Sequence, residues 1–372
     1  MTDHAFLPPS GAGAWVHCGL WPTMQVRFPE PPDAPASMEG TATHWAMAEM
    51  LLRDDPAEGS RAPNGMVLTG EMLESADVMV DAVRAVMAAN PDAELHVEQR
   101  VVGQRIHPSQ NWGTIDVRIW SPSKRRLWLF DFKHGHGIVE VHENWQLINY
   151  AALACSRLNG LDEQHTHVEM IVVQPRAHHP DGPVRRWSVV ASDLRAWWNR
   201  LEMAAEDATS VDPKARPGDY CEHCTGRHAC EALQRDAYRS ADRSRVSLPL
   251  ELPLSAASLE LQMLEGALAR LDARVSGLRD QVRNGIERGQ VDARYVLERS
   301  AGRRAWTVPP AQVIALGKAM KVPLAKPLEP ITPTQALKAG IPEAVLAACT
   351  DRPAGTVKLV PFANSAAARV FN

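Results

Sequence analysis

The chain of 372 residues lacks several features that would assign it to common classes. No apolar run approaches the roughly 20 residues needed to span a bilayer, and the start, Met1-Thr2-Asp3-His4, lacks the basic and apolar segments of a secretory signal. Its net charge of −4 argues against a protein that coats DNA through basic charge. No GxxxxGK[ST] sequence is present, so a helicase motor is not expected. We therefore expect a cytoplasmic protein without membrane contact, whose thiols stay reduced.

Apolar periodicity predicts an α/β core with a mixed sheet. The chain is 45% hydrophobic, enough for two or three folded units. Spacing of three and four residues predicts helices, and short β-prone runs predict strands. Ser192 is expected to cap a helix that runs to about residue 208. The other expected helices cover residues 38–52, 71–89 and 143–157, and the expected strands cover 95–106, 114–120, 126–133, 166–174 and 187–190.

Two of these expected strands contain acidic residues near their ends. Asp116 interrupts one apolar run, and Asp131 and Lys133 end the next. Because strand side chains alternate between faces, Asp131 and Lys133 point to one side and Phe132 to the other. If the strands pair as a hairpin, Asp116 lies beside the same edge. Two carboxylates and an ammonium group then meet, and such a site can hold a divalent cation for phosphodiester hydrolysis.

Three further residues strengthen this interpretation through their order. His44 lies on the first expected helix, and Gln146 and Tyr150 share a face of the helix after Lys133 because they are four residues apart. Taken singly, each is more often a packing or surface residue. The series His, GxxD, DxK and QxxxY resembles the motif series of RecB-type nucleases in the PD-(D/E)XK superfamily. Residues 4–12 and 39–41 are similar to phage and prophage members, and the resemblance spans about residues 4–235.

The resemblance implies a restriction-endonuclease-like PD-(D/E)XK core with a mixed central sheet flanked by helices, and it implies metal ligands. Asp116, Asp131 and the backbone carbonyl of Phe132 would bind Mg²⁺ or Mn²⁺. His44 would be a further ligand, which favours Mn²⁺ because imidazole is softer than carboxylate. Glu98, on the preceding strand, is a weaker candidate for metal or water contact, since an exposed strand acid would explain it equally well.

The same resemblance implies roles for the remaining motif residues. Lys133 would orient the attacking water and stabilise the charge that develops on the phosphate. Gln146 would steady Lys133 or the scissile strand, and Tyr150 would support Gln146.

Three of the six cysteines lie close together near residue 225. Cys221, Cys224 and Cys230 form a C-x2-C-x5-C pattern, which in a reducing compartment indicates metal binding. A zinc site would need a fourth ligand, which His223 or His228 could supply.

The RecB resemblance implies a different fourth ligand. In the iron–sulfur subgroup, which includes the AddB nuclease domain and CRISPR-associated RecB-like exonucleases, one cysteine precedes the nuclease core and three follow it. Cys18 occupies the early position, and four thiolates suit a 4Fe–4S cluster. We favour such a structural cluster over zinc. Cys155 and Cys349 are expected to be core thiols.

The last third of the chain falls outside the resemblance. We expect a nuclease domain over residues 1–245 and a mainly helical extension of unassigned role over residues 246–372. The extension would contain a helix over 255–289, a basic hairpin from 293–298 and 304–308, and a small helical tail. Apolar residues in the long helix step by three and four, as in a heptad seam. We expect this short seam to pack on its own domain rather than in an intermolecular coiled coil. Its members are Leu261, Leu264, Leu268, Leu271, Val275, Leu278 and Val282.

Taken together, the motifs predict a Mg²⁺- or Mn²⁺-dependent DNA exonuclease that acts on double-strand ends or single-stranded DNA. The resemblance to phage proteins suggests recombination or end processing in a bacterial cell, with a single-strand annealing protein as a partner. Two alternatives stay open: a structure-specific endonuclease, and a non-catalytic DNA-binding or assembly protein that retains the nuclease fold. Oligomeric state and direction of digestion are left open.

Overall fold

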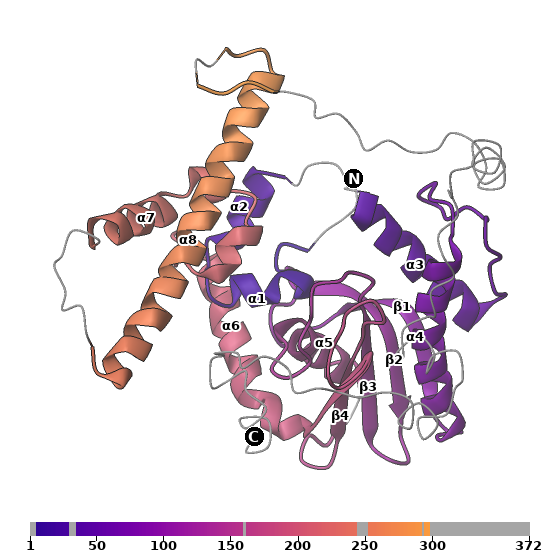
Figure 1. Ribbon diagram of the computed structural model, residues 1–372. Coiled ribbons are helices and arrows are strands. Elements are labelled where there is room, and N and C mark those ends of the chain that lie inside the picture. Colours follow the sequence, from indigo (N-terminus) through magenta and orange to yellow (C-terminus); the bar gives the residue numbers. More distant parts are fainter. Residues whose placement is uncertain (1–4, 30–34, 159–160, 244–251, 292–293, 298–372) are drawn as a thin grey trace, which may run out of the picture. The chain divides into compact units, whose positions relative to one another are not determined.

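The computed structural model of the chain describes residues 5–29, 35–158, 161–243, 252–291 and 294–297 (Figure 1). A five-stranded sheet in the order β1-β2-β3-β4-β5 lies at its centre. Strands β3 and β4 are parallel, and the other neighbouring pairs are antiparallel. The expected mixed sheet is therefore confirmed. The strands are β1 (Glu94–Val102), β2 (Trp112–Ser121), β3 (Arg126–Phe132), β4 (His167–Val173) and β5 (Val184–Val190).

Helices cover both faces of the sheet, which explains why its central strands are nearly continuous apolar runs. One face packs against α3 (Pro35–Leu52) and α4 (Gly70–Ala88) through a core that includes Met47, Val83 and Phe130. The other face packs against α5 (Trp145–Cys155) and α6 (Arg195–Thr209). The chain between β3 and β4 crosses over through α5, as parallel neighbours require.

The N-terminal residues form short helices on the α5 and α6 side of the sheet. These are η1 (Pro9–Gly11), α1 (Ala12–Trp15) and α2 (Trp21–Arg27), where η denotes a 3₁₀ helix. Trp15 is fully buried there, and its indole N–H donates to the carbonyl of Pro8 at 2.9 Å. The helix α2 also reaches the cysteine segment, because the hydroxyl of Thr225 lies 2.6 Å from the side-chain oxygen of Gln25. Tertiary packing thus brings together segments about 200 residues apart in sequence.

The expected cap at Ser192 is wrong. A 3₁₀ helix, η2 (Ala191–Leu194), precedes α6, and the residue before α6 is Leu194, whose side chain makes no capping hydrogen bond. The amide of Arg195 instead donates to the carbonyl of Ser192. Such a 3₁₀ turn satisfies free backbone groups at the helix start without a side-chain cap.

The long helix α8 (Leu254–Glu287) packs on the cysteine segment and on α7 (Glu231–Arg243). The cysteine segment contains η3 (Asp219–His223) and η4 (Arg227–Ala229). Arg227 forms an ion pair with Asp280, and Ala273 packs with Cys221 and Leu233. The compact unit therefore includes α8 and extends to residue 297. The expected division into a nuclease domain and an extension at residue 245 stays a prediction.

The expected basic hairpin lies mostly outside the described residues, and residues 294–297, which are described, are not in a strand. The expected helical tail and Cys349 also lie outside them. Among the described helices, none is both long and apolar enough to cross a membrane.

Candidate functional site

Three carboxylates lie in a row across β1, β2 and β3. Strand β2 pairs with β3 only over residues 117–121, but it pairs with β1 along almost its whole length. Asp116 is therefore the first residue beyond the β2–β3 pairing. The strand registers on either side place Glu98 and Asp131 opposite it. The two aspartates expected to meet are thus neighbours, and Glu98 joins them.

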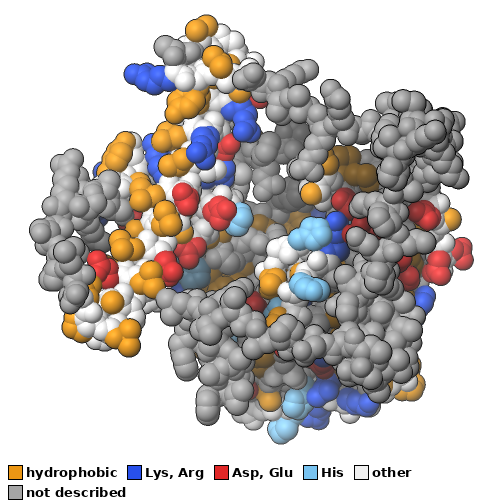
Figure 2. All heavy atoms as spheres, viewed as in Figure 1, with side chains coloured by type: hydrophobic (Ala, Val, Ile, Leu, Met, Phe, Trp, Pro, Cys, Tyr) orange, Lys and Arg blue, Asp and Glu red, His pale blue; other side chains and the backbone are white. Residues whose placement is uncertain are grey.

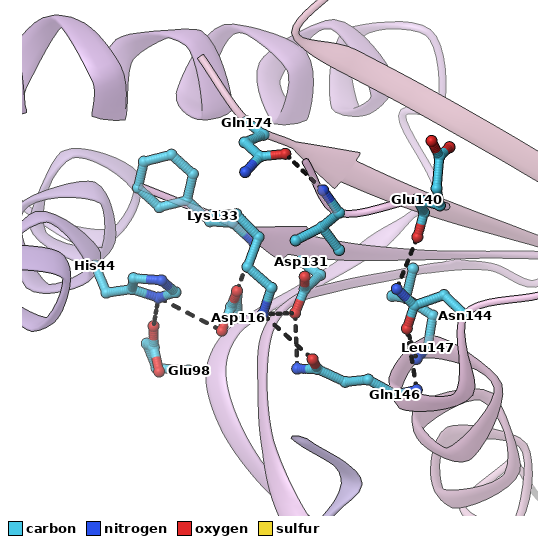
Figure 3. A network of polar contacts seen from close by, with 12 residues as sticks. His44, Glu98, Asp116, Asp131, Lys133, Glu140, Asn144, Gln146, Leu147 and Gln174 are labelled. Atoms are coloured by element: carbon cyan, nitrogen blue, oxygen red, sulfur yellow. Dashed lines mark hydrogen bonds and ion pairs between the residues drawn. The ribbon is translucent and has the colours of Figure 1, made fainter. Parts of the chain in front are cut away.

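The change in pairing at Asp116 opens the sheet to side chains from both faces. Ile115 belongs to the core under α5, whereas Val117 belongs to the core under α3 and α4. Two residues that would share a face in a regular strand therefore face opposite ways. This twist lets His44 approach from α3 and Gln146 from α5, as Figure 3 shows.

His44, Glu98 and Asp116 form a candidate metal centre. One ligand atom from each lies within 4.8 Å of the others. The Nδ1 atom of His44 is 3.6 Å from Oε1 of Glu98 and 3.5 Å from Oδ1 of Asp116. Burial lowers the pKa of His44, but the two carboxylates outweigh it and raise the pKa to about 9. One imidazole and two carboxylates fit a hard divalent cation with some tolerance for nitrogen, such as Mn²⁺ or Mg²⁺.

Asp131, Lys133 and Gln146 form a second group beside this centre. The Lys133 ammonium donates to Oδ1 of Asp131 at 3.0 Å and to Oε1 of Gln146 at 3.2 Å. The amide of Gln146 donates to the same oxygen of Asp131 at 2.8 Å (Figure 3). Burial lowers the pKa of Lys133, but the carboxylates of Asp131 and Asp116 outweigh it, so the pKa lies above its usual value. Lys133 therefore stays charged at neutral pH.

Asp131 is buried and Asp116 is half-buried, and the two are close enough to affect ionisation. Burial raises the pKa of Asp131, and the negative charge of Asp116 raises it further. Burial also raises the pKa of Asp116, although His44 opposes this. One oxygen of Asp116 accepts a 2.7 Å hydrogen bond from the backbone N–H of Phe132. A bound cation would favour the charged form of both carboxylates, which supports the fit of a metal to this site.

Two more predicted residues lie behind this group. Tyr150 is buried and hydrogen-bonded to the side chain of Gln146, and burial raises its pKa. The ring of Phe132 packs 5.1 Å from the ring of His44, with its side chain in the core under α3 and α4 as the strand alternation predicts. Ligation by the carbonyl of Phe132 stays a prediction.

Sequence reasoning missed the residues that hold α3 over the end of β3. The ring of His134, next to Lys133, is buried, and its Nε2 lies 3.1 Å from Oε1 of Glu39 and 2.8 Å from Nη1 of Arg176. Its Nδ1 lies 3.2 Å from the hydroxyl of Ser75 on α4. Glu39 is five residues before His44 on α3, so this network sets the position of His44. The sequence signal for this network was His134 itself, a polar residue directly after the Asp131-Phe132-Lys133 motif.

Asn144, also missed, orients the start of α5. Its side-chain oxygen accepts hydrogen bonds from the amides of Gln146 at 3.0 Å and Leu147 at 3.2 Å. This is a helix N-cap, which residue type and position next to an expected helix could have indicated.

The cysteine segment forms a separate cavity. Cys18, Cys221, Cys224 and Cys230 all line one space of about 20 Å³ that opens between α2 and the cysteine segment. Burial raises the pKa of Cys221 to about 11 and of Cys224 to about 12, and neighbouring cysteines add to both shifts. Four thiols around one small cavity fit a tetrahedral metal or a metal–sulfur cluster. Cys155 lies elsewhere, buried in the core under α5, as expected.

The fold and the site define an α/β protein with an acidic candidate metal centre and a four-cysteine cavity. Residues 4–366 match the family described as "Protein of unknown function (DUF2800)", and the chain belongs to this family. A crystal structure titled "Putative exonuclease", from Eubacterium rectale, is similar at 8% identity over 68% of this chain and 92% of that chain, with a TM-score of 0.34. The crystal structure of SSO0001 is similar at 14% identity over 44% of this chain and 75% of that chain, with a TM-score of 0.25.

Proposed function

We propose that this chain is a metal-dependent DNA exonuclease with a RecB-like PD-(D/E)XK core. The observation that carries the proposal is the convergence of Asp116, Asp131 and Lys133, with His44 on one side and Gln146 on the other. The composition of this site suits phosphodiester hydrolysis. Acidic ligands and imidazole bind a cation, and a separate ammonium group is available to a negatively charged substrate.

His44, Glu98 and Asp116 would hold Mn²⁺ or Mg²⁺, with Asp131 next to them as a further ligand. When bound, such a cation polarises a phosphoryl oxygen and makes a bound water a better nucleophile. Lys133 would donate hydrogen bonds to the phosphate as negative charge develops there. Asp131 and Gln146 hold the ammonium in place, which limits the reorganisation needed during the reaction.

Aromatic and basic side chains extend from this site toward the cysteine segment and support DNA as the substrate. Trp145 directly precedes Gln146, and the guanidinium of Arg200 lies 5.4 Å from its ring. The ring of His17 lies 6.0 Å from Trp145 and stacks on Tyr220 at 5.6 Å. His17, Arg200 and Tyr220 line an open groove of about 680 Å³. Aromatic rings beside cations are typical of surfaces that bind single-stranded nucleic acid.

The cysteine cavity would hold a structural 4Fe–4S cluster, with zinc as the alternative. The cavity combines Cys18 with Cys221, Cys224 and Cys230, as the RecB resemblance implies. Burial disfavours the charged thiolates, and the positive charge of a bound metal would stabilise them.

The decisive experiment offers labelled linear DNA to anaerobically purified protein with Mg²⁺ or Mn²⁺. We expect wild-type protein to degrade the DNA from its ends, and Asp131→Asn and Lys133→Ala to be slower by roughly a hundredfold or more, because each loses a charge at the reacting phosphate. Asp193→Asn is the matched control, since Asp193 is exposed on η2, away from the site. The proposal fails if folded wild-type protein degrades no DNA with either metal, or if both site variants keep the control rate.

The same assay separates the alternatives. Cleavage of closed circular DNA would indicate a structure-specific endonuclease. DNA binding without cleavage, equal in wild type and site variants, would indicate a non-catalytic binding protein. An annealing partner and a role in phage-type recombination in the bacterial cytoplasm are part of the proposal and would be tested by co-purification from infected cells.

A further inference from the structure

The apolar seam of α8 faces away from the rest of the described chain. Five of its seven side chains are at least 40% exposed, which is unusual for leucine and valine in a regular helix. They are Leu261 at 40%, Leu264 at 60%, Leu268 at 58%, Val275 at 41% and Leu278 at 41%. The helix packs on its own unit as expected, but among the described residues its apolar seam is not the face that packs.

A different face of α8 makes the contacts with the cysteine segment. Ala273 is buried, and Gly277 lies so close to η4 that an added Cβ would be 2.8 Å from the backbone nitrogen of His228. Arg270 on the same face pairs with Asp236 of α7 at 2.5 Å. If Leu261 is assigned to heptad position a, the seam occupies positions a and d. Arg270 and Gly277 then occupy position c and Ala273 position f, on the opposite side of the helix. Small residues there allow close packing and leave the leucines pointing outward.

Charges beside the seam are divided along the helix. Glu260, Glu265 and Asp272 flank its first half, and Arg274 and Arg279 flank its second half. Figure 2 shows hydrophobic side chains along α8, with basic side chains gathered toward its C-terminal end. Residues that flank a seam determine which helix can pair with it and in which direction.

We propose that the α8 seam pairs with the same seam of a second copy of this chain, in antiparallel orientation. In a parallel pair Glu260 would face Glu265 of the partner subunit, and Arg274 would face Arg279 of the partner subunit. Both contacts are repulsive. In the antiparallel pair Leu268 packs against Leu278 of the partner subunit.

The same antiparallel register brings Leu271 against Val275 of the partner subunit and Glu265 beside Arg279 of the partner subunit. Glu260 then approaches Arg288 of the partner subunit. Asp272 and Arg274 each meet their own copy at the two-fold axis, which reduces the gain there, although the guanidinium of Arg274 already donates to the carbonyl of His228. Shifting the register by one heptad in one direction would place Glu265 beside Asp272 of the partner subunit, so charge disfavours that shift.

Oligomeric state tests the apolar part of the proposal. Full-length protein at micromolar concentration should sediment as a dimer, and Leu264→Glu with Leu268→Glu should make it a monomer with unchanged helical content. Gln262→Glu, on the same helix but outside the seam, should leave the dimer intact. A monomeric wild type would overturn the proposal, and it would mean that the chain beyond residue 297 or another partner covers the seam.

Charge reversal tests the orientation and needs no loss of apolar packing. Glu265→Arg alone and Arg279→Glu alone should each weaken the dimer by roughly fivefold, because two attractive pairs per dimer become repulsive. The double variant should restore wild-type affinity. In a parallel pair each single reversal would instead create attraction to Glu260 or Arg274. Single variants that dimerise more tightly than wild type would therefore overturn the antiparallel arrangement.

Discussion

At the scale of single residues, Glu98 has a backbone conformation that few residues of its type adopt. Its φ of 47° lies in the left-handed region, although it sits within β1. For a residue other than glycine this costs about 1–3 kcal/mol, and such strain often marks a functional site. The strained backbone coincides with the contact between Glu98 and His44 at 3.6 Å. The strained backbone thus positions Glu98 at the candidate metal centre.

Glu98→Gln should therefore weaken Mn²⁺ binding by about tenfold or more, because a charged ligand is lost while the size of the side chain is kept. Isothermal titration calorimetry on metal-free protein would measure this change. The control is Glu94→Gln, since Glu94 is exposed at the start of the same strand. Equal Mn²⁺ affinity in Glu98→Gln and wild type would show that Glu98 is an ordinary strand acid.

At the scale of elements, the two helix N-caps offer a matched comparison. Asn144 caps α5, whose first turn carries Gln146, and Thr69 caps α4 by accepting from the amide of Met72. Each cap satisfies free N–H groups at a helix start. Only the cap at Asn144 belongs to an element whose first turn reaches the candidate site, so the two caps should differ in their effect on activity.

We expect Asn144→Ala and Thr69→Ala each to lower the free energy of unfolding by about 1 kcal/mol. Only Asn144→Ala should also slow DNA degradation, because Gln146 would lose its fixed position beside Lys133. Urea unfolding and nuclease rates measure the two effects, and Asn144→Asp should retain both. An equal effect of the two alanine variants on the rate would argue against a positioning role for Asn144.

At the scale of the whole molecule, the cysteine cavity joins the N-terminal helices and the cysteine segment, on which α8 packs. Cys18 contributes from the loop before α2, Cys221 lies in η3, and Cys224 and Cys230 directly follow η3 and η4. Ala273 of α8 packs on Cys221. A metal bound in the cavity would link segments about 200 residues apart and so reduce the entropy of the unfolded chain.

Cys18→Ser should lose more than half of the bound metal and unfold at a lower temperature. Elemental analysis for iron and zinc, together with the visible absorbance of anaerobic protein, would follow the metal. Cys155→Ala is the control, because Cys155 is buried in the sheet core and not in the cavity; it should keep its metal. Full metal content in Cys18→Ser would mean that His223 or His228 supplies the fourth ligand.

The sequence by itself determined which residues could form the candidate site and which elements carry them. Local periodicity and chemical type placed His44, Asp116, Asp131, Lys133 and Gln146 on helices and strands whose expected positions agree with the structure to within a few residues. Side-chain alternation correctly put Asp131 and Lys133 on one side, because that alternation follows from the geometry of a single strand.

Only the tertiary structure decided the features that depend on contacts between distant segments. Strand register made Glu98 a neighbour of Asp116, and the network around His134 set the distance from α3 to β3. A heptad pattern shows that one face of α8 is apolar, but it cannot show that Ala273 and Gly277 on another face pack on the cysteine segment. The register between strands and the packing of a helix on a distant segment depend on contacts between residues far apart in sequence. Local sequence periodicity therefore does not determine them.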